Sequence, residues 1–275
     1  MEFIENEKFK IGINEIGGNL TSIIDLSNNQ ELIHQLDDGG WPVQDVMIFP
    51  LIGQYEYNFN NFTYNVPTRH GIIRNKKLSF NKKSNTELVA TYVSTEEDLK
   101  VYPFKFKLEI NYKLKDDKYI LMFNVFNLDD KTMYFSIGNH LGIKTNSSTY
   151  IDLKNNNKIL KLSSGFIDLN ESKFVVNKFK LTQDIFTKYD TMVFKNETNE
   201  IKLVTLTHRF IYEFNSPLFA IWQNPASNNF VCIEPWWGIA SYINEEKDMT
   251  KRAYINKLDP NESKSFVMSI TILKN

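Results

Sequence analysis

The stretch from Phe104 to Leu114, FKFKLEINYKL, alternates apolar and polar residues without a break. A period of two puts successive side chains on opposite faces of a strand, so this segment buries one face and exposes the other. The run YILMFNVFNL at 119–128 follows after the polar turn KDDK, and together the two runs predict an antiparallel hairpin. Near the C-terminus, SFVMSITIL alternates in the same way and predicts a strand docked in a sheet.

Turn-forming clusters separate such runs along the chain, for example LSNNQ at 26–30, KNNNK at 154–158 and LDPNES at 258–263. Helical periodicity is weak, and the best short candidates are STEEDLK at 94–100 and LTQDIFTKY at 181–189. No linker, charge block or internal repeat divides the sequence. We therefore predict a single all-β domain over residues 1–275, a large antiparallel β-sandwich of two big sheets with a few short helices.

Composition narrows the class of protein further. The 275 residues are 42% hydrophobic, enough for a large core, and a net charge of -1 gives no sign of a nucleic-acid or acidic-membrane partner. The single cysteine, Cys232, excludes an internal disulfide framework and favours a reducing compartment. The N-terminus lacks a signal-peptide pattern, and no apolar run approaches the roughly 18 residues that a membrane helix needs. We expect a cytoplasmic protein.

Several standard chemical motifs are missing. The sequence has no G-x-S-x-G, no G-x-x-x-x-G-K-[ST] and no H-E-x-x-H. The residues that could bind zinc lack the close paired spacings of zinc sites: His34, His70, His140, His208 and Cys232. We expect neither a metal nor a bound cofactor.

Three segments place polar residues in apolar, aromatic-rich surroundings: TRHGIIRN with His70, YFSIGNHLGI with His140, and FVCIEPWWGIAS with Glu234. A lone histidine near a turn is more often a hydrogen-bonded structural residue than a catalyst. Glu234 is costly to bury without a partner, so an internal salt bridge, for instance to an arginine, is the alternative to a functional role. Adjacent strand residues point to opposite faces, so either Trp236 or Trp237 should leave the core and could stack on a sugar ring.

Taken in order, FPLIGQYEYNFNNFTYNVPTRHG, YPFKFKLEINYKL, GNHLGI and CIEPWWG resemble the aldose 1-epimerases, or galactose mutarotases, and are most similar to the LacX-like branch. The resemblance covers nearly the whole chain and is weakest over 145–205. It implies a large antiparallel supersandwich with a sugar site on its concave face. It also implies an enzyme of carbohydrate metabolism that interconverts the α and β anomers of a free aldose.

Carried over residue by residue, the resemblance implies that His70 holds the sugar, His140 acts as general acid and Glu234 acts as general base. Opening a hemiacetal ring removes a proton from the anomeric hydroxyl and donates one to the ring oxygen, so we expect an acid and a base that face opposite sides of the same small group. Burial should raise the pKa of Glu234, and a nearby carboxylate should favour protonated His140. Positive charge near His70 should keep its imidazole neutral.

Further residues are expected to bind substrate. Arg74 would share a face with His70 if the segment is extended, and Arg69 would then point away. Gln54 stands where many family members carry an arginine. Asp190 is the nearest match to a binding aspartate of the family, although an exposed strand-edge aspartate is the simpler interpretation. The substrate-binding residues that we expect are His70, Arg74, Gln54, Asp190 and Trp236.

Other functions stay open at this point. A sugar-phosphate epimerase of the same fold needs cations at the cleft, and Arg69, Arg74, Lys76 and Lys77 would allow it. A non-catalytic carbohydrate-binding protein is a second alternative. A glycoside hydrolase ranks last, because the sequence offers no obvious second carboxylate near Glu234. In each case the expected partner is a small sugar, and a homodimer is left open.

Overall fold

The computed structural model describes residues 1–36, 41–53, 56–163, 166–182, 185–186, 191–198, 200–224 and 227–275. Antiparallel strands dominate these residues, as the alternating sequence predicted. The helical elements with assigned bounds are short 3-10 turns: η1 (Ile73–Asn75), η2 (Asp98–Lys100) and η3 (Met249–Lys251). The all-β prediction is confirmed.

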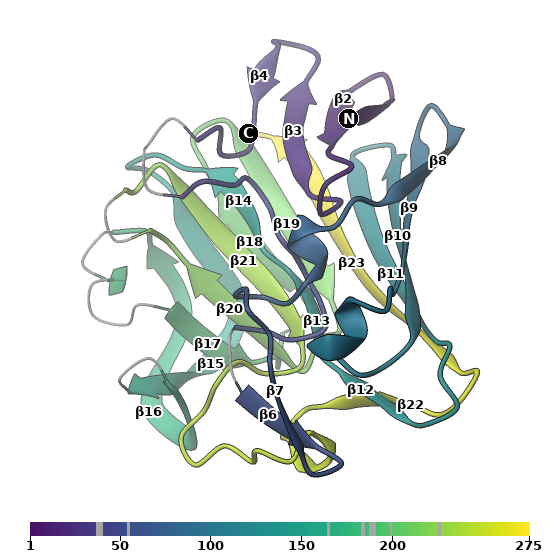
Figure 1. The fold of residues 1–275 in the computed structure, drawn as a ribbon. Helices are drawn as coiled ribbons and strands as arrows, with labels where there is room; N and C mark the ends of the chain where they lie inside the picture. The colour runs from purple at the N-terminus through teal and green to yellow at the C-terminus, as the bar shows by residue number, and fades with distance from the viewer. Residues whose placement is uncertain are drawn as a thin grey trace.

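One long sheet contains 15 of the described strands. In hydrogen-bonded order it runs through β5 (Met47–Ile48), β13 (Ile137–Asn139), β21 (Phe230–Trp237), β20 (Leu218–Trp222), β17 (Thr191–Lys195), β15 (Tyr150–Ser163), β18 (Glu200–Val204), β19 (His208–Phe214), β23 (Ser263–Lys274), β11 (Lys118–Asn127), β10 (Phe106–Lys115), β9 (Glu87–Val93) and β8 (Ser79–Ser84). Two strands branch from this path: β14 (Leu141–Lys144) pairs with β21, and β16 (Phe166–Lys180) pairs with β15. Figure 1 shows β8 to β11 on the right and β15 to β17, β20 and β21 on the left.

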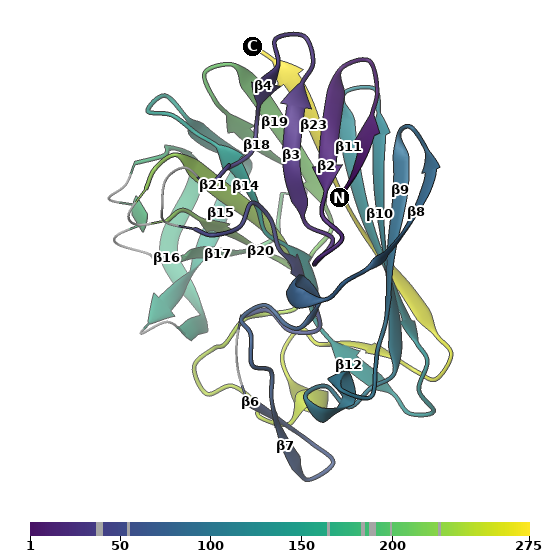
Figure 2. The same cartoon turned by 45° about the horizontal axis from the view of Figure 1, so that its top comes forward.

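Smaller sheets complete the fold. They are a four-stranded sheet of β1 (Glu2–Glu5), β2 (Phe9–Ile13), β3 (Leu20–Asp25) and β4 (Gln30–Glu31), the hairpin β6 (Glu56–Phe59) with β7 (Phe62–Asn65), and the pair β12 (Met133–Phe135) with β22 (Asn256–Leu258). The four-stranded sheet lies between the two halves of the long sheet (Figure 2). The residues that flank its strands contact both halves: the Tyr112 hydroxyl donates to the carbonyl of Gly18, just before β3, and Ile33, just after β4, bridges to Ile143. Where we predicted two big sheets, the two halves are continuous through β18, β19 and β23.

The individual elements predicted from periodicity compare well with the structure. The hairpin is β10 and β11, paired from Phe106 with Asn127 to Lys115 with Lys118, and the C-terminal strand is β23, which pairs with both β11 and β19. The helix expected at 94–100 is reduced to η2, and most of the candidate at 181–189 lies outside the described residues, with 185–186 helical. Within the described parts of the chain, no helix has the length and apolar character needed to cross a bilayer.

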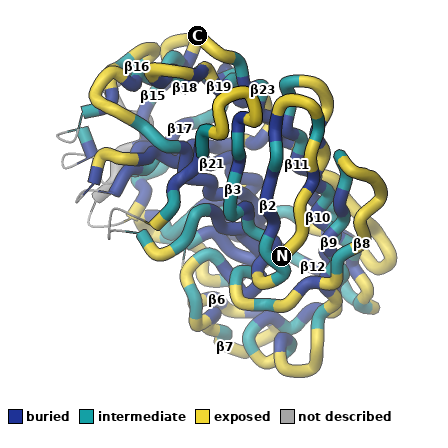
Figure 3. Tube along the Cα trace, turned by 90° about the horizontal axis from the view of Figure 1, so that it is seen from above, coloured by how far each residue is buried: buried dark blue, intermediate teal, exposed yellow. Residues whose placement is uncertain are grey.

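Two apolar clusters hold these layers together. The larger contains the buried aromatic side chains of the central strands, among them Phe106, Phe123 and Trp237. The smaller includes Val46 and Trp236. Trp236 and Trp237 therefore point to opposite faces of β21, as predicted, and Trp236 belongs to the face outside the main core. Figure 3 shows the buried positions along the central strands and the exposed ones mainly in the turns. Each fully buried large apolar side chain contributes about 1.5–3 kcal/mol.

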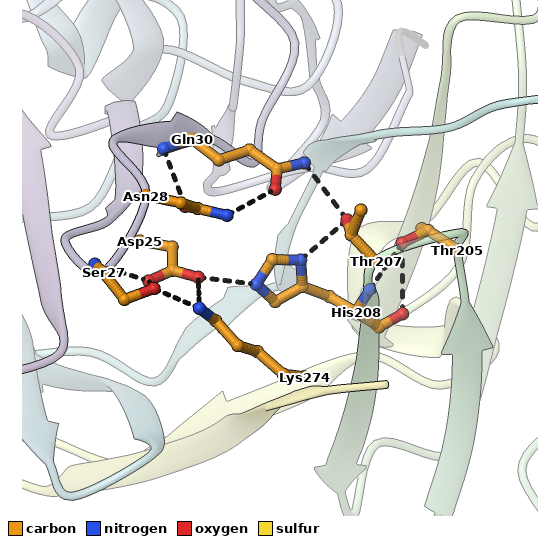
Figure 4. Close-up of polar contacts among 8 residues, drawn as sticks. All are labelled: Asp25, Ser27, Asn28, Gln30, Thr205, Thr207, His208 and Lys274. Carbon is orange, nitrogen blue, oxygen red and sulfur yellow. Dashed lines mark hydrogen bonds and ion pairs between the residues drawn. The ribbon is translucent and has the colours of Figure 1, made fainter.

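A polar cluster joins the four-stranded sheet to the long sheet (Figure 4). Asp25 at the end of β3 accepts from His208 Nε2 at 3.1 Å and lies 3.2 Å from Lys274 Nζ, and it also accepts from the Ser27 hydroxyl at 2.7 Å. Burial raises the pKa of Asp25, but the hydrogen bonds from these three partners outweigh burial and hold the pKa at about 2. His208 thus has the structural role expected of a lone histidine.

Candidate active site

Strand pairing brings His140 and Glu234 together. In β13, Gly138 pairs with Trp236, and in β14, Leu141 pairs with Ile233. The same antiparallel register continues through the break between the two strands, so His140 lies opposite Glu234. On its other side, His140 exchanges two backbone hydrogen bonds with Val46, at 3.0 and 3.1 Å. Cross-strand neighbours project from the same face, so the imidazole and the carboxyl group meet.

The two side chains are in direct contact. His140 Nε2 lies 3.2 Å from Glu234 Oε1, and the residues are only 7% and 2% exposed. The indole N–H of Trp236 donates to Glu234 Oε2 at 3.2 Å. Gly138 permits this packing, because a Cβ there would lie 2.6 Å from the Pro235 carbonyl oxygen. The partner of the buried carboxyl group is thus a histidine, not the arginine considered from the sequence.

Burial sets the charge of this pair. Burial raises the pKa of Glu234 to about 8, against a smaller opposing effect of the Trp236 hydrogen bond. Burial lowers the pKa of His140 well below its usual range, and His70 and two nearby arginines lower it further. The raised pKa of Glu234 confirms the prediction. The expectation of a protonated His140 is wrong, because desolvation dominates and the neighbouring carboxyl group is itself uncharged near pH 7.

The hydrogen bonds also locate the protons of the neutral pair. An indole N–H can only donate, so Glu234 Oε2 acts as acceptor and the carboxylic acid proton belongs on Oε1, facing His140 Nε2. The imidazole then carries its proton on Nδ1, which is buried and has no hydrogen-bond partner among the described residues. The neutral pair holds one shared proton on the 3.2 Å contact.

His70 lies beside this pair, with its ring centroid 5.4 Å from that of His140 and nearly perpendicular to it. The backbone N–H of Gly53 donates to His70 Nδ1 at 3.3 Å, which assigns the proton of the neutral ring to Nε2. Burial, with Arg74 and Arg69, lowers the pKa of His70 to about 3, so the predicted neutral imidazole is confirmed.

The segment around His70 is not extended, and the prediction built on that conformation is wrong. His70 has φ +69° and Gly71 has φ +88°, and a Cβ on Gly71 would lie 2.0 Å from the Phe49 carbonyl oxygen. The chain turns and enters η1 at Ile73. In consequence Arg69 does not point away, and both Arg69 and Arg74 line the same cavity as His70.

Two tryptophans that sequence reasoning missed enclose the imidazole of His140. Trp41 stacks on its face with ring centroids 4.9 Å apart, and Trp222 meets it edge-on at 5.5 Å. Both are half-buried. The sequence did offer one signal for them: the chain has only four tryptophans, and three of these line the cavity. Trp236, predicted to stack on a sugar, lines the cavity and also bonds to Glu234.

The cavity has a volume of about 550 Å³, within the range of small-molecule sites. Its remaining wall is mostly apolar and includes Val46, Ile167, Val193 and Ala240. Gln54 and Asp190 lie outside the described residues. In the described ranges, no group of three or more His, Cys, Asp or Glu side chains is arranged to hold a metal ion.

The chain is similar in sequence and structure to known proteins. A family model described as aldose 1-epimerase matches residues 3–271. Protein LacX of Lactococcus lactis subsp. lactis is 23% identical over 296 residues, covering 98% of each chain. A galactose mutarotase related enzyme from Lactobacillus acidophilus superposes with a TM-score of 0.92 at 26% identity, over 99% of this chain and 97% of that one. A galactose 1-epimerase from Lactobacillus acidophilus NCFM shares the fold, with a TM-score of 0.78 at 13% identity over 99% and 94%.

Proposed function

The chain belongs to the aldose 1-epimerase family of isomerases, and from this premise we propose that it interconverts the α and β anomers of an aldose by general acid/base catalysis. His140 and Glu234 would carry the proton transfers. The observation that supports this most is their direct 3.2 Å contact in the wall of a cavity that can hold a monosaccharide.

The proton balance of the reaction matches the pair. Ring opening takes a proton from the anomeric hydroxyl and delivers one to the ring oxygen as the bond between that oxygen and C1 breaks. Rotation about the C1–C2 bond and closure in the reverse sense give the other anomer. Because one proton enters and one leaves, His140 and Glu234 must share the same number of protons, one between them, before and after each step. The neutral pair does so, and a shift of that proton from Glu234 Oε1 to His140 Nε2 creates the carboxylate base and the imidazolium acid.

The neighbouring groups suit substrate binding. The neutral ring of His70, bonded at Nδ1 by Gly53, has its Nε2–H left to donate to a sugar hydroxyl. Trp41 and Trp222 offer aromatic surfaces on which the C–H face of a pyranose can pack. We propose free aldoses as the first substrates to test, in line with the family.

The test measures anomer interconversion by polarimetry of freshly dissolved α-anomers of several aldoses. Wild type is compared with His140→Asn and Glu234→Gln, and Glu213→Gln serves as control because that carboxylate is exposed and pairs with Lys118 on the surface. Each site variant should lose about 10²- to 10⁴-fold in rate while the control keeps wild-type activity.

Equal rates in all four proteins would refute acid/base catalysis by this pair. A non-catalytic carbohydrate-binding protein, the competing interpretation, would leave interconversion at its spontaneous rate in every sample while calorimetry still detected sugar binding.

A further inference from the structure

Two arginines of the cavity have no counter-charge among the residues that the structure describes. Arg69 and Arg74 both line the wall that holds His140 and Glu234. The Arg74 Nη1 donates to the backbone carbonyl of Arg69 at 3.1 Å, and neither guanidinium forms an ion pair with a carboxylate among the described residues. Arg252, in contrast, is held by Glu245 at 3.0 Å.

Other charges on the same segment are neutralised. Lys76 lies 2.6 Å from Asp98 and Lys77 lies 3.3 Å from Glu15, and neither lysine lines the cavity. The cation cluster considered from the sequence thus separates into two paired lysines outside the site and two arginines inside it that pair with no described carboxylate.

The described wall of the cavity holds no carboxylate that would balance this charge near pH 7. Glu234 is the acidic residue of the described wall, and it is protonated near pH 7 because burial raises its pKa to about 8. Burial lowers the pKa of Arg74, and the nearby charge of Arg69 lowers it further. Arg74 is half-buried while Arg69 is exposed to solvent, and an anion bound between them would compensate both the desolvation of Arg74 and the repulsion between the two charges.

We propose that the substrate carries an anionic substituent, a phosphate or a carboxylate, which Arg69 and Arg74 bind while the anomeric carbon lies against His140 and Glu234. This rests on the proposed function and specifies its substrate class. Guanidinium groups present planar, paired N–H donors that match the oxygens of either anion. A cavity of about 550 Å³ leaves room for such a substituent beside a pyranose ring.

An anion bound there also acts on the chemistry. Arg74 and Arg69 both lower the pKa of His70 and of His140, so their positive field reaches the reacting groups. An anion between the guanidinium groups cancels part of that field and makes His140 easier to protonate. The substituent should therefore raise kcat as well as lower KM.

The test compares a neutral sugar with its two charged counterparts. Anomer exchange of glucose, glucose 6-phosphate and glucuronate is measured by NMR magnetisation transfer, with the enzyme-free rate subtracted for each. The proteins are wild type, Arg69→Gln, Arg74→Gln, the double variant, and Lys77→Gln as a control from the same segment whose side chain is 70% exposed.

For wild type, kcat/KM for at least one charged sugar should exceed that for glucose by about tenfold or more, because charge-assisted hydrogen bonds are lost with the neutral sugar. The double variant should reduce the ratio of kcat/KM for the charged sugar to kcat/KM for glucose to near unity, whatever its own rate on glucose, and Lys77→Gln should keep the wild-type ratio. Added salt should weaken the charged advantage alone. The phosphate and carboxylate arms tell which anion the site accepts.

Two results would overturn the proposal. If glucose reacts as fast as both charged sugars and the double variant changes nothing, the anion site is wrong while the epimerase function stands. If no sugar reacts, the proposed function fails, and calorimetric titration with glucose 6-phosphate decides the anion site separately. Binding to wild type that is lost in the double variant would still support the anion site, whereas equal or absent binding in both would refute it.

Discussion

The wild type should lose stability as the pH rises because Glu234 is buried, and the Glu234→Gln substitution should remove this loss. The amide can reproduce both contacts of the protonated side chain, since its oxygen accepts from the Trp236 indole and its N–H donates to His140 Nε2. At every pH, position 234 of the Glu234→Gln variant should therefore contribute to stability as the protonated Glu234 does in wild type.

The magnitude follows from the shift of the Glu234 pKa from 4.5 to about 8. Above pH 4.5 the unfolded chain releases the proton that the folded chain keeps, so the folded state binds more protons in this window. The free energy of unfolding then falls as the pH rises and levels off above about 8. From about pH 5 to about pH 7.5 the linkage relation gives a loss of roughly 3 kcal/mol in wild type and none from position 234 in the variant.

Urea unfolding followed by tryptophan fluorescence at these two pH values measures the effect. The stability of Glu234→Gln relative to wild type should increase by roughly 3 kcal/mol between them, while Glu213→Gln, which changes an exposed carboxylate, should show no comparable rise. A difference that stays constant with pH would mean that Glu234 is ionised and His140 protonated, and would refute the neutral pair.

Three other properties can be tested. Asp25→Asn should lower the free energy of unfolding at neutral pH by about 2 kcal/mol, because the lowered pKa of Asp25 stabilises the fold above its unfolded pKa; in urea titrations this loss should vanish as the pH falls through about 2. Gly71→Ala should lower the thermal midpoint strongly or prevent folding, since the new Cβ would meet the Phe49 carbonyl oxygen at 2.0 Å, and an unchanged midpoint would contradict the described turn. Cys232 is buried with a raised pKa, so a disulfide reagent should modify it only at the rate of unfolding, and rapid labelling of the folded protein would contradict this burial.

The sequence predicted the strands well because their signal is local. The alternation in β10 and β11 requires only that one face be buried, and any sheet that buries it satisfies the pattern. The opposite directions of Trp236 and Trp237 follow from the same rule. The residue types of the pair, a histidine after a strand and a glutamate within an apolar one, also stand out locally.

What the sequence could not provide was the register between distant strands. The contact between His140 and Glu234 depends on which residues of β13, β14 and β21 face each other, and no local pattern fixes that pairing. The conformation at His70 was missed for a related reason. Its positive φ occurs where the chain packs against a distant segment, with the backbone of His70 bonded to Phe49 and Gly53 and Gly71 lying close to Phe49.

The placement of the pair on paired strands constrains how a sugar can react. From the sequence we expected acid and base on opposite sides of the substrate, but His140 and Glu234 project from the same face of the long sheet and touch. Both oxygens that exchange protons in ring opening are bonded to one carbon, so adjacent groups can reach them from a single side. The backbone ladder holds the two side chains together on either flank, through Val46 and β21. In the reaction that we propose, the substrate would then approach from the open side of this face, with C1 toward the pair, and the proton that leaves one oxygen would reach the other by way of the same contact.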